Sequence, residues 1–363
     1  MIIEVLKALL IGVVEGVTEW LPVSSTGHMI LVDEFVKLAV SPAFLELFLV
    51  VIQIGAICAV LILYFHKLNP FSPCKTPAQK RSTWRLWGMV VIGCIPAAII
   101  GFTLDDFFNE HFYNAWTVAI ALIVYGVIFI VLERHNRKRE AAYLEQREAR
   151  RIAAERPRGR HARPQAAAAA AAPAGTLVRN TGSYYNDPSI SGRLPKTEVR
   201  RTASGEEEAR PGFDGDDAEM ALFKVQTVDD IDWKTALKIG CFQMLAIIPG
   251  TSRSGSTIIG GMLCGCSRTA AAEFTFFLAI PVMFGWGLLK TVKYIAELGL
   301  AMTGTEIAVL VTGILTAFVV SVISIKFLMG YIKKNDFTAF GVYRIVVGVV
   351  VLAYFGAKAV GLF

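Results

Sequence analysis

The chain has 363 residues, of which 54% are hydrophobic and 18% are charged, and its mean hydropathy is +0.53. Soluble globular domains are less apolar and more charged, so this composition excludes an ordinary soluble domain and indicates a membrane protein. The net charge of +6 does not indicate nucleic-acid binding, because residues 133–232 hold 18 of the 36 Lys and Arg residues together with 17 of the 30 Asp and Glu residues.

The first 42 residues contain a short polar segment, from Glu15 to His28, with apolar residues on both sides. Pro22 breaks the first predicted helix, and Ser24-Ser25-Thr26-Gly27 is typical of the start of the next. Such a start offers free N–H groups and a positive dipole end to an anion, although ordinary capping uses the same residue types. A polar break within a membrane must be buried in protein or line a cavity. We therefore expect residues 1–42 to form a re-entrant helical hairpin.

Two carboxylates of this segment, Glu15 and Glu19, are four residues apart and share a helix face. Ionisable groups are costly in a bilayer, so their presence indicates function. Adjacent carboxylates repel each other, which allows an acid and a base to coexist. They could equally hold a divalent cation, Mg²⁺ or Ca²⁺, which takes oxygen ligands and bridges to phosphate. A solvated helix end is the third interpretation, and the apolar flanks Leu9–Val14 and Trp20-Leu21 disfavour it.

Ser25 and His28 are three residues apart and also share a helix face. This arrangement suits a nucleophile with its base, or a histidine that accepts the phosphoryl group itself. A lone histidine in an apolar helix is more often a hydrogen-bonded core residue. The neighbouring glutamates and the anion-type loop favour the catalytic interpretation.

Six apolar runs predict membrane-spanning helices, which need about 20 residues each. They are Ala43–Phe65, Leu86–Leu104, Ala115–Leu132, Phe274–Leu289, Ile307–Ile325 and Ile345–Ala357. The last run is short unless it extends through Arg344 or Lys358. Gln53 lies deep in the first run and could hydrogen-bond a bound group. Because unpaired backbone cannot face lipid, the fold class is an all-α integral membrane protein.

Positive charge orients these spans. Residues 66–85 hold five Lys and Arg residues and no acid, residues 134–163 hold 11 against four acids, and Lys333-Lys334 mark a third turn. The positive-inside rule places all three on the cytoplasmic side. Residues 133–232 contain few apolar residues that could form a core, so we expect a largely disordered cytoplasmic insertion. Residues 134–156 could continue the preceding helix into water.

With those loops inside, residues 234–268 must begin and end on the cytoplasmic side, as a second re-entrant hairpin. Pro249-Gly250 ends its first helix, and Thr251–Ser256 lead into the next. Arg253 sits at this break, and a guanidinium binds phosphate bidentately. An arginine that snorkels to the surface is the alternative, which fits Arg268 better.

The two hairpins are alike in sequence when they are shifted by 228 residues. The shift pairs Gly12 with Gly240, Glu15 with Gln243, Ser24 with Ser252, Thr26 with Ser254, and Gly27 with Gly255. With residues 66–85 inside, Ala43 at the other end of the first span faces outward, so the first hairpin opens outward and the second opens inward. We therefore expect an inverted-topology repeat in which residues 1–132 and 233–363 each supply a hairpin and three spans. In such folds the site lies near the midplane, where the broken helices meet. The identities are few, and chance alignment is the alternative.

The segments from Glu15 to His28 and from Pro249 to Thr257 closely resemble the signatures of the bacterial undecaprenyl-diphosphate phosphatases, or bacitracin-resistance proteins. Further matches are Val50–Gly55, Ile95-Pro96, Ser267-Arg268, Glu273-Phe274 and Tyr343-Arg344. The resemblance covers about residues 1–132 and 233–363. It implies a plasma-membrane hydrolase that removes the terminal phosphate of undecaprenyl diphosphate, regenerates the lipid carrier for peptidoglycan synthesis and depends on a divalent cation.

The resemblance also implies roles for individual residues. Glu15 and Glu19 match the acidic pair, Ser25 and His28 the nucleophile and base region, and Arg253 the phosphate-binding arginine. It does not settle which of Ser25 and His28 takes the phosphoryl group, and we favour attack by Ser25 with help from His28. We expect the remaining phosphate contacts from Ser24, Thr26, Gly27, Gln53, Ser252, Ser254 and Gly255.

The chain departs from the family pattern at two places. The family often has an acid just ahead of Val-Ile-Gln, where Leu49 and Val50 stand here. It also usually has a short loop in place of residues 134–232. The alternative function is a transporter or flippase of a phosphorylated polyprenyl lipid, because inverted repeats with broken helices are transporter architecture. A scaffold is a third interpretation, and a homodimer is compatible with the sequence.

Overall fold

The computed structural model describes residues 1–112, 114–155, 198–201, 207–210, 222–299 and 302–361. Contacts divide the chain into a membrane unit, residues 1–137 with 223–363, and a second unit, residues 138–222. The helices are α1 (Ile2–Thr18), α2 (Ser25–Phe35), α3 (Pro42–Leu63), α4 (Phe65–Leu68), α5 (Pro77–Phe112), α6 (Ala115–Glu155), η2 (Val228–Asp230), α8 (Trp233–Met244), η3 (Leu245–Ile247), α9 (Arg253–Leu263), α10 (Arg268–Leu298), α11 (Gly304–Ile332) and α12 (Thr338–Ala359).

Six of these helices are long and apolar enough to cross a membrane: α3, α5, α6, α10, α11 and α12. They confirm the prediction of an all-α membrane protein with six spans. Five of them include one of the apolar runs in full, and α3 covers the first run up to Leu63. The last helix reaches spanning length because it extends through both Arg344 and Lys358. The predicted continuation beyond the third run is also present, since α6 ends at Glu155.

The second unit contains two short antiparallel strands, β1 (Glu198–Arg201) and β2 (Glu207–Arg210), with Glu198 opposite Arg210. The sequence predicts no strand there. Most of the segment expected to be disordered lies outside the described residues.

The membrane unit reaches further into the predicted insertion than the boundaries at 132 and 232 allow. Four apolar side chains ahead of α8 are buried: Phe223, Val225, Val228 and Ile231. Backbone hydrogen bonds join Val225 to the turn before α10, from Val225 N to Gly265 O at 3.0 Å and from Ser267 N to Val225 O at 2.8 Å. Burial of these side chains against the membrane helices moves the boundary to Phe223.

At the other boundary, Glu133 is fully buried and forms an ion pair with Arg268, whose Nη2 lies 2.8 Å from Glu133 Oε2. Its other oxygen accepts a hydrogen bond from the backbone N–H of Phe337. Glu133 thus ties α6 to α10 and α12. Arg268 is therefore a buried structural partner and does not snorkel to the surface.

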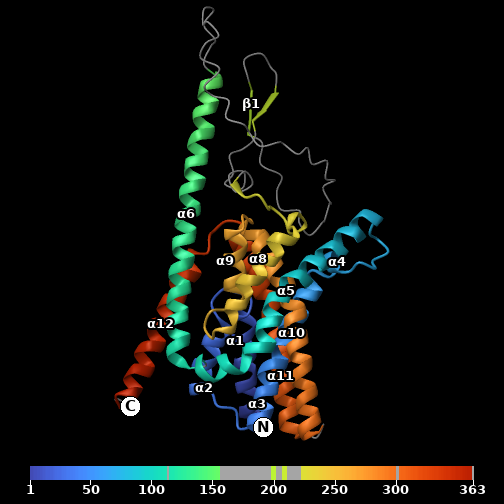
Figure 1. Cartoon of the computed structure of the whole chain (residues 1–363), viewed down its shortest axis with the longest axis vertical. Helices are drawn as coiled ribbons and strands as arrows, with labels where there is room; N and C mark the ends of the chain where they lie inside the picture. The colour runs from blue at the N-terminus through green and yellow to red at the C-terminus, as the bar shows by residue number, and fades with distance from the viewer. Residues whose placement is uncertain (113, 156–197, 202–206, 211–221, 300–301, 362–363) are drawn as a thin grey trace, which may run out of the picture. The chain divides into compact units, whose positions relative to one another are not determined.

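Two breaks interrupt the helices, one between α1 and α2 and one between α8 and α9. The helix before each break packs against a spanning helix of the other half of the chain: α1 packs against α11, and α8 packs against α5 (Figure 1). Glycines allow the close approach at both contacts. A Cβ atom at Gly12 would lie 2.9 Å from the carbonyl oxygen of Gly313, and one at Gly240 would clash with the backbone of Gly93. At the centre, α3 packs against α10, and α10 also contacts α9. The two breaks are thereby enclosed by helices.

Candidate active site

The two breaks share an unusual backbone conformation. Ser24 caps α2 with a φ of 75°, and Ser252 caps α9 with a φ of 72°. Within the described parts of the chain, these are the only non-glycine residues with positive φ. Each serine hydroxyl accepts a hydrogen bond from the N–H three residues on, Gly27 at 3.3 Å and Gly255 at 3.1 Å. Such backbone strain, about 1–3 kcal/mol per residue, concentrates at functional sites.

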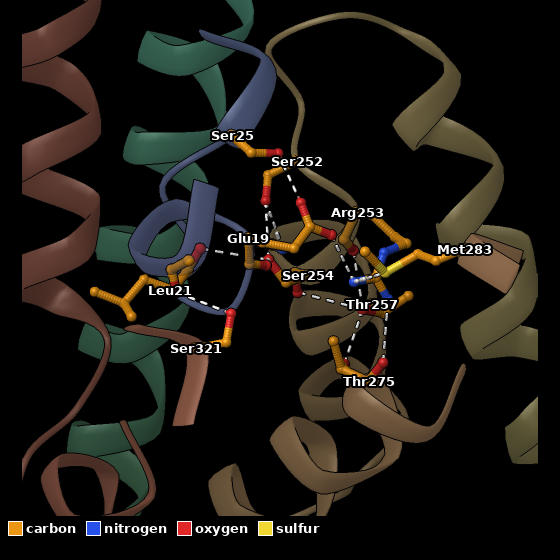
Figure 2. Close-up of polar contacts among 12 residues, drawn as sticks. Glu19, Leu21, Ser25, Ser252, Arg253, Ser254, Thr257, Thr275, Met283 and Ser321 are labelled. Atoms are coloured by element: carbon orange, nitrogen blue, oxygen red, sulfur yellow. Dashed lines mark hydrogen bonds and ion pairs between the residues drawn. The ribbon is translucent and has the colours of Figure 1, made fainter. Parts of the chain in front are cut away.

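A single carboxylate joins the two breaks (Figure 2). Ser25 Oγ donates a hydrogen bond to Glu19 Oε2 at 2.8 Å, and Arg253 Nη2 lies 2.9 Å from Glu19 Oε1. The ion pair is largely buried, with 12% of the Arg253 side chain and 9% of the Glu19 side chain exposed. A hydroxyl from one hairpin and a guanidinium from the other therefore converge on one acid.

The second break is anchored to the first. Ser254 Oγ donates to the carbonyl oxygen of Glu19 at 3.2 Å. Arg253 Nη1 donates to the carbonyl oxygen of Thr275 on α10 at 3.2 Å, and Nη2 also lies 3.8 Å from the sulfur of Met283 (Figure 2). Next to Glu19, Trp20 is fully buried and packs edge-to-face on Phe276 of α10. These contacts fix the position of the guanidinium and of the carboxylate.

These groups border a small polar cavity of about 180 Å³. Seven of the residues expected at the site line it: Glu19, Ser25, Thr26, Gln53, Ser252, Arg253 and Ser254. At about 30 Å³ per water molecule in the liquid, the volume suffices for a phosphoryl group and its oxygens.

Three further expected residues shape the helix starts. Ser24 is buried, and a Cβ atom at Gly27 would lie 3.2 Å from Leu122. A Cβ atom at Gly255 would lie 3.0 Å from the Arg344 guanidinium.

His28 has partners other than Ser25. Its Nδ1 lies 2.7 Å from the carbonyl oxygen of Ser24, and its Nε2 lies 2.8 Å from the hydroxyl of Tyr343 on α12. The expected contact between Ser25 and His28 is replaced by the one between Ser25 and Glu19. The i, i+3 spacing placed both residues on one face, but the first residue of the helix turns its hydroxyl back toward the preceding loop.

Comparison with known proteins identifies the family of the chain. The family model described as bacitracin resistance protein BacA matches residues 8–154 and 210–350. The undecaprenyl-diphosphatase of Desulfitobacterium hafniense is 44% identical over 99% of this chain and 99% of its own length. The proteins of the same name from Enterococcus faecalis and Streptococcus thermophilus are each 43% identical, over 96% and 99% of this chain and 96% of their own lengths. The chain belongs to the BacA family.

Glu15 is the other acid that the sequence predicts at the site of this BacA-family chain. It lies on α1, one turn before Glu19, which caps the end of that helix. Only 2% of it is exposed, and its Oε1 has no hydrogen-bond partner within the described residues. Nowhere in the described ranges do three or more His, Cys, Asp or Glu side chains cluster as a ready-made metal site. Glu15 is therefore a buried acceptor with free capacity beside the Glu19 network.

Sequence reasoning missed two groups that hold the site. The backbone carbonyl of Thr275 orients Arg253. A pattern of side chains in the sequence cannot predict a hydrogen-bond acceptor on the backbone. Arg344 hydrogen-bonds to both breaks, whereas its position in the sequence indicates only a family match and the end of a span. A charged residue within an apolar run was the available signal. Both residues fall inside the ranges matched by the BacA family.

Proposed function

We propose that the chain is a membrane phosphatase that hydrolyses undecaprenyl diphosphate to undecaprenyl phosphate and inorganic phosphate. This reaction recycles the lipid carrier for cell-wall synthesis. One observation carries the proposal: the Ser25 hydroxyl and the Arg253 guanidinium both contact the Glu19 carboxylate in one cavity, which supports the roles of nucleophile, phosphate-binding cation and base for these residues. Curated relatives that match nearly the whole chain are named for the same activity.

Each side chain has a defined role in this reaction. Ser25 Oγ attacks the terminal phosphorus and passes its proton to Glu19, to which it is already hydrogen-bonded. The bond to the bridging oxygen breaks, and Glu19 returns the proton to the undecaprenyl phosphate that leaves, which restores the Glu19 carboxylate. Arg253 balances the negative charge on the terminal phosphoryl oxygens. Glu19 then takes a proton from water, which attacks the phosphoserine and releases inorganic phosphate and the free hydroxyl of Ser25.

An apolar groove beside the polar cavity suits the polyprenyl chain. It has a volume of about 540 Å³ and runs between α5, the end of α8, η3 and α10. Residues common to the groove and the polar cavity are Ala246, Arg253, Val282 and Trp286. The diphosphate can therefore lie at Arg253 while the chain follows the groove toward Ala97 and Leu289. Largely apolar clefts with few polar groups are typical of such ligand sites.

We also propose the finer topology of the membrane unit: two re-entrant hairpins in an inverted repeat, in the plasma membrane, with the insertion on the cytoplasmic side. Three observations support the repeat. Helices α2 and α9 both have 11 residues and begin 228 positions apart, at Ser25 and Arg253. Their caps share the positive-φ conformation. The contacts of α1 with α11 and of α8 with α5 are reciprocal between the halves.

A divalent cation, Mg²⁺ or Ca²⁺, fits the acidic side of the site. Carboxylate oxygens are the donors these ions take, and Glu15 offers a buried oxygen to which the described residues give no hydrogen bond. Glu15 and Glu19 would hold the ion, and the Glu19 oxygens also contact Ser25 and Arg253. When bound, the ion would supply charge neutralisation to the diphosphate.

Removing divalent cations is expected to abolish phosphate release, and adding Mg²⁺ or Ca²⁺ back should restore it. Glu15→Gln should raise the cation concentration for half-maximal activity by at least about tenfold, since a carboxylate is lost from the site. Titration of chelator-treated protein with each ion measures both effects. Full activity in excess chelator would restrict Glu15 and Glu19 to proton transfer and charge.

The function itself is tested with purified protein in detergent, supplied with undecaprenyl diphosphate. A phosphatase releases inorganic phosphate without a membrane. A flippase needs an anion site but no nucleophile, so it would move lipid across vesicles and release no phosphate. Wild-type protein that transports lipid but never hydrolyses it would refute the proposed function.

A further inference from the structure

Arg344 lies at the point where α12 passes both breaks. Its side chain is fully buried. The guanidinium donates to three backbone carbonyl oxygens: Pro22 at 3.2 Å, Gly250 at 2.9 Å and Thr251 at 2.8 Å. One of these carbonyls belongs to the first break and two belong to the second, so one side chain joins segments more than 200 residues apart in the sequence.

The positions of these carbonyls matter for the site. Pro22 lies three residues before Ser25, and Thr251 lies two residues before Arg253. Regular helical hydrogen bonding stops at both breaks, and buried carbonyls left unpaired would be costly. The guanidinium donates hydrogen bonds to carbonyl oxygens of both breaks, and its rigid, planar donors fix the direction of each bond.

Neighbouring residues fit the same arrangement. Gly255 has no side chain where a Cβ atom would lie 3.0 Å from Arg344 Nη1. The ring of Tyr125 on α6 faces the guanidinium at 5.5 Å, which favours a buried cation. The preceding residue on α12, Tyr343, bonds to His28 of α2. Two consecutive residues of α12 therefore form hydrogen bonds to residues at the start of α2 or just before it.

We propose that Arg344 is a positioning residue for the phosphatase reaction: it sets the two breaks in register so that Ser25 and Arg253 meet the same phosphorus. The inference rests on the proposed function and adds a residue that contacts neither the Glu19 carboxylate nor the attacking hydroxyl. Misplacement of reacting groups by about 1 Å costs about 10²-fold in rate. Substrate binding depends largely on the polyprenyl groove, which Arg344 does not line.

The test compares Arg344→Lys and Arg344→Ala in the full chain with wild type, by kcat and KM for phosphate release and by thermal unfolding. We expect Arg344→Ala to lower kcat about 10²-fold with KM within about threefold of wild type. Arg344→Lys keeps the charge but cannot reach three carbonyls in fixed directions, so its kcat should be intermediate. Millimolar guanidinium should restore part of the kcat of Arg344→Ala by occupying the vacated space.

Arg268→Ala is the matched control, because Arg268 is also buried but pairs with Glu133, and it does not line the cavity. It should lower thermal stability and yield, while the folded fraction keeps the wild-type kcat and does not respond to guanidinium. Wild-type phosphate release in the same assay establishes the function separately. If the folded fraction of Arg344→Ala, or Arg344→Lys where the alanine variant does not fold, turns over at the wild-type kcat, Arg344 has no positioning role.

Discussion

Ser25→Ala is expected to lower the rate of phosphate release by about 10⁴-fold or more, the largest effect of any single substitution in this chain. Removal of a hydroxyl nucleophile costs this much in other hydrolases because no remaining group can form the covalent intermediate. Ser25 is the hydroxyl that donates to the Glu19 carboxylate, at 2.8 Å. Initial rates of inorganic phosphate release by purified protein measure the loss.

Thr26→Ala is the matched control for this substitution. Thr26 lines the same cavity and also carries a hydroxyl. We expect its loss to reduce the rate by less than about tenfold, as for one neutral hydrogen bond to substrate. A folded Ser25→Ala protein that keeps a tenth or more of wild-type activity would exclude Ser25 as the nucleophile.

Arg253→Ala is expected to lower kcat/KM by about 10³–10⁵-fold, the range known for arginines that balance phosphoryl charge. Arg253→Lys should fall between wild type and alanine, because an ammonium keeps the charge without the bidentate geometry. The effect has a second source in this structure. Loss of the guanidinium leaves the Glu19 carboxylate, of which 9% is exposed, without its ion-pair partner. Steady-state kinetics of the three proteins test the order.

A double-mutant cycle separates the two contributions. Glu19→Gln alone should cost about 10²–10⁴-fold by removing the base. Since Arg253 and Glu19 are in direct contact at 2.9 Å, the losses in Arg253→Ala with Glu19→Gln should be less than additive. Fully additive losses would mean that the two residues act independently and that the ion pair has no part in the reaction.

The sequence predicts the spans well because hydropathy reports directly on lipid contact. The two breaks are also predictable, since proline, glycine and hydroxyl residues interrupt apolar helices at both places. The contact between Ser25 and Glu19 is not, because a loop of unknown shape separates them. Helical periodicity relates residues within one helix and says nothing about a hydroxyl that turns back across a break. This is why the sequence favours His28 as the partner of Ser25.

Long-range partners are hidden for a similar reason. Arg253 and Glu19 lie 234 residues apart, and only packing of the two hairpins brings them together. The sequence does not predict the boundary at Phe223, because four apolar side chains hardly change the overall composition of an acidic stretch. The shift of 228 residues rested on few identities, yet the caps Ser24 and Ser252 share a strained backbone that sequence does not display.

Rapid-quench labelling with substrate that carries a labelled terminal phosphate tests the central claim most directly. If Ser25 attacks the phosphorus, wild-type protein should form an alkali-labile phosphoserine at Ser25 at least as fast as it turns over, and Ser25→Ala should form none. Label that is acid-labile and maps to His28 would contradict the account. So would the absence of any labelled protein within the first turnover of an active enzyme, which would point to direct attack by water.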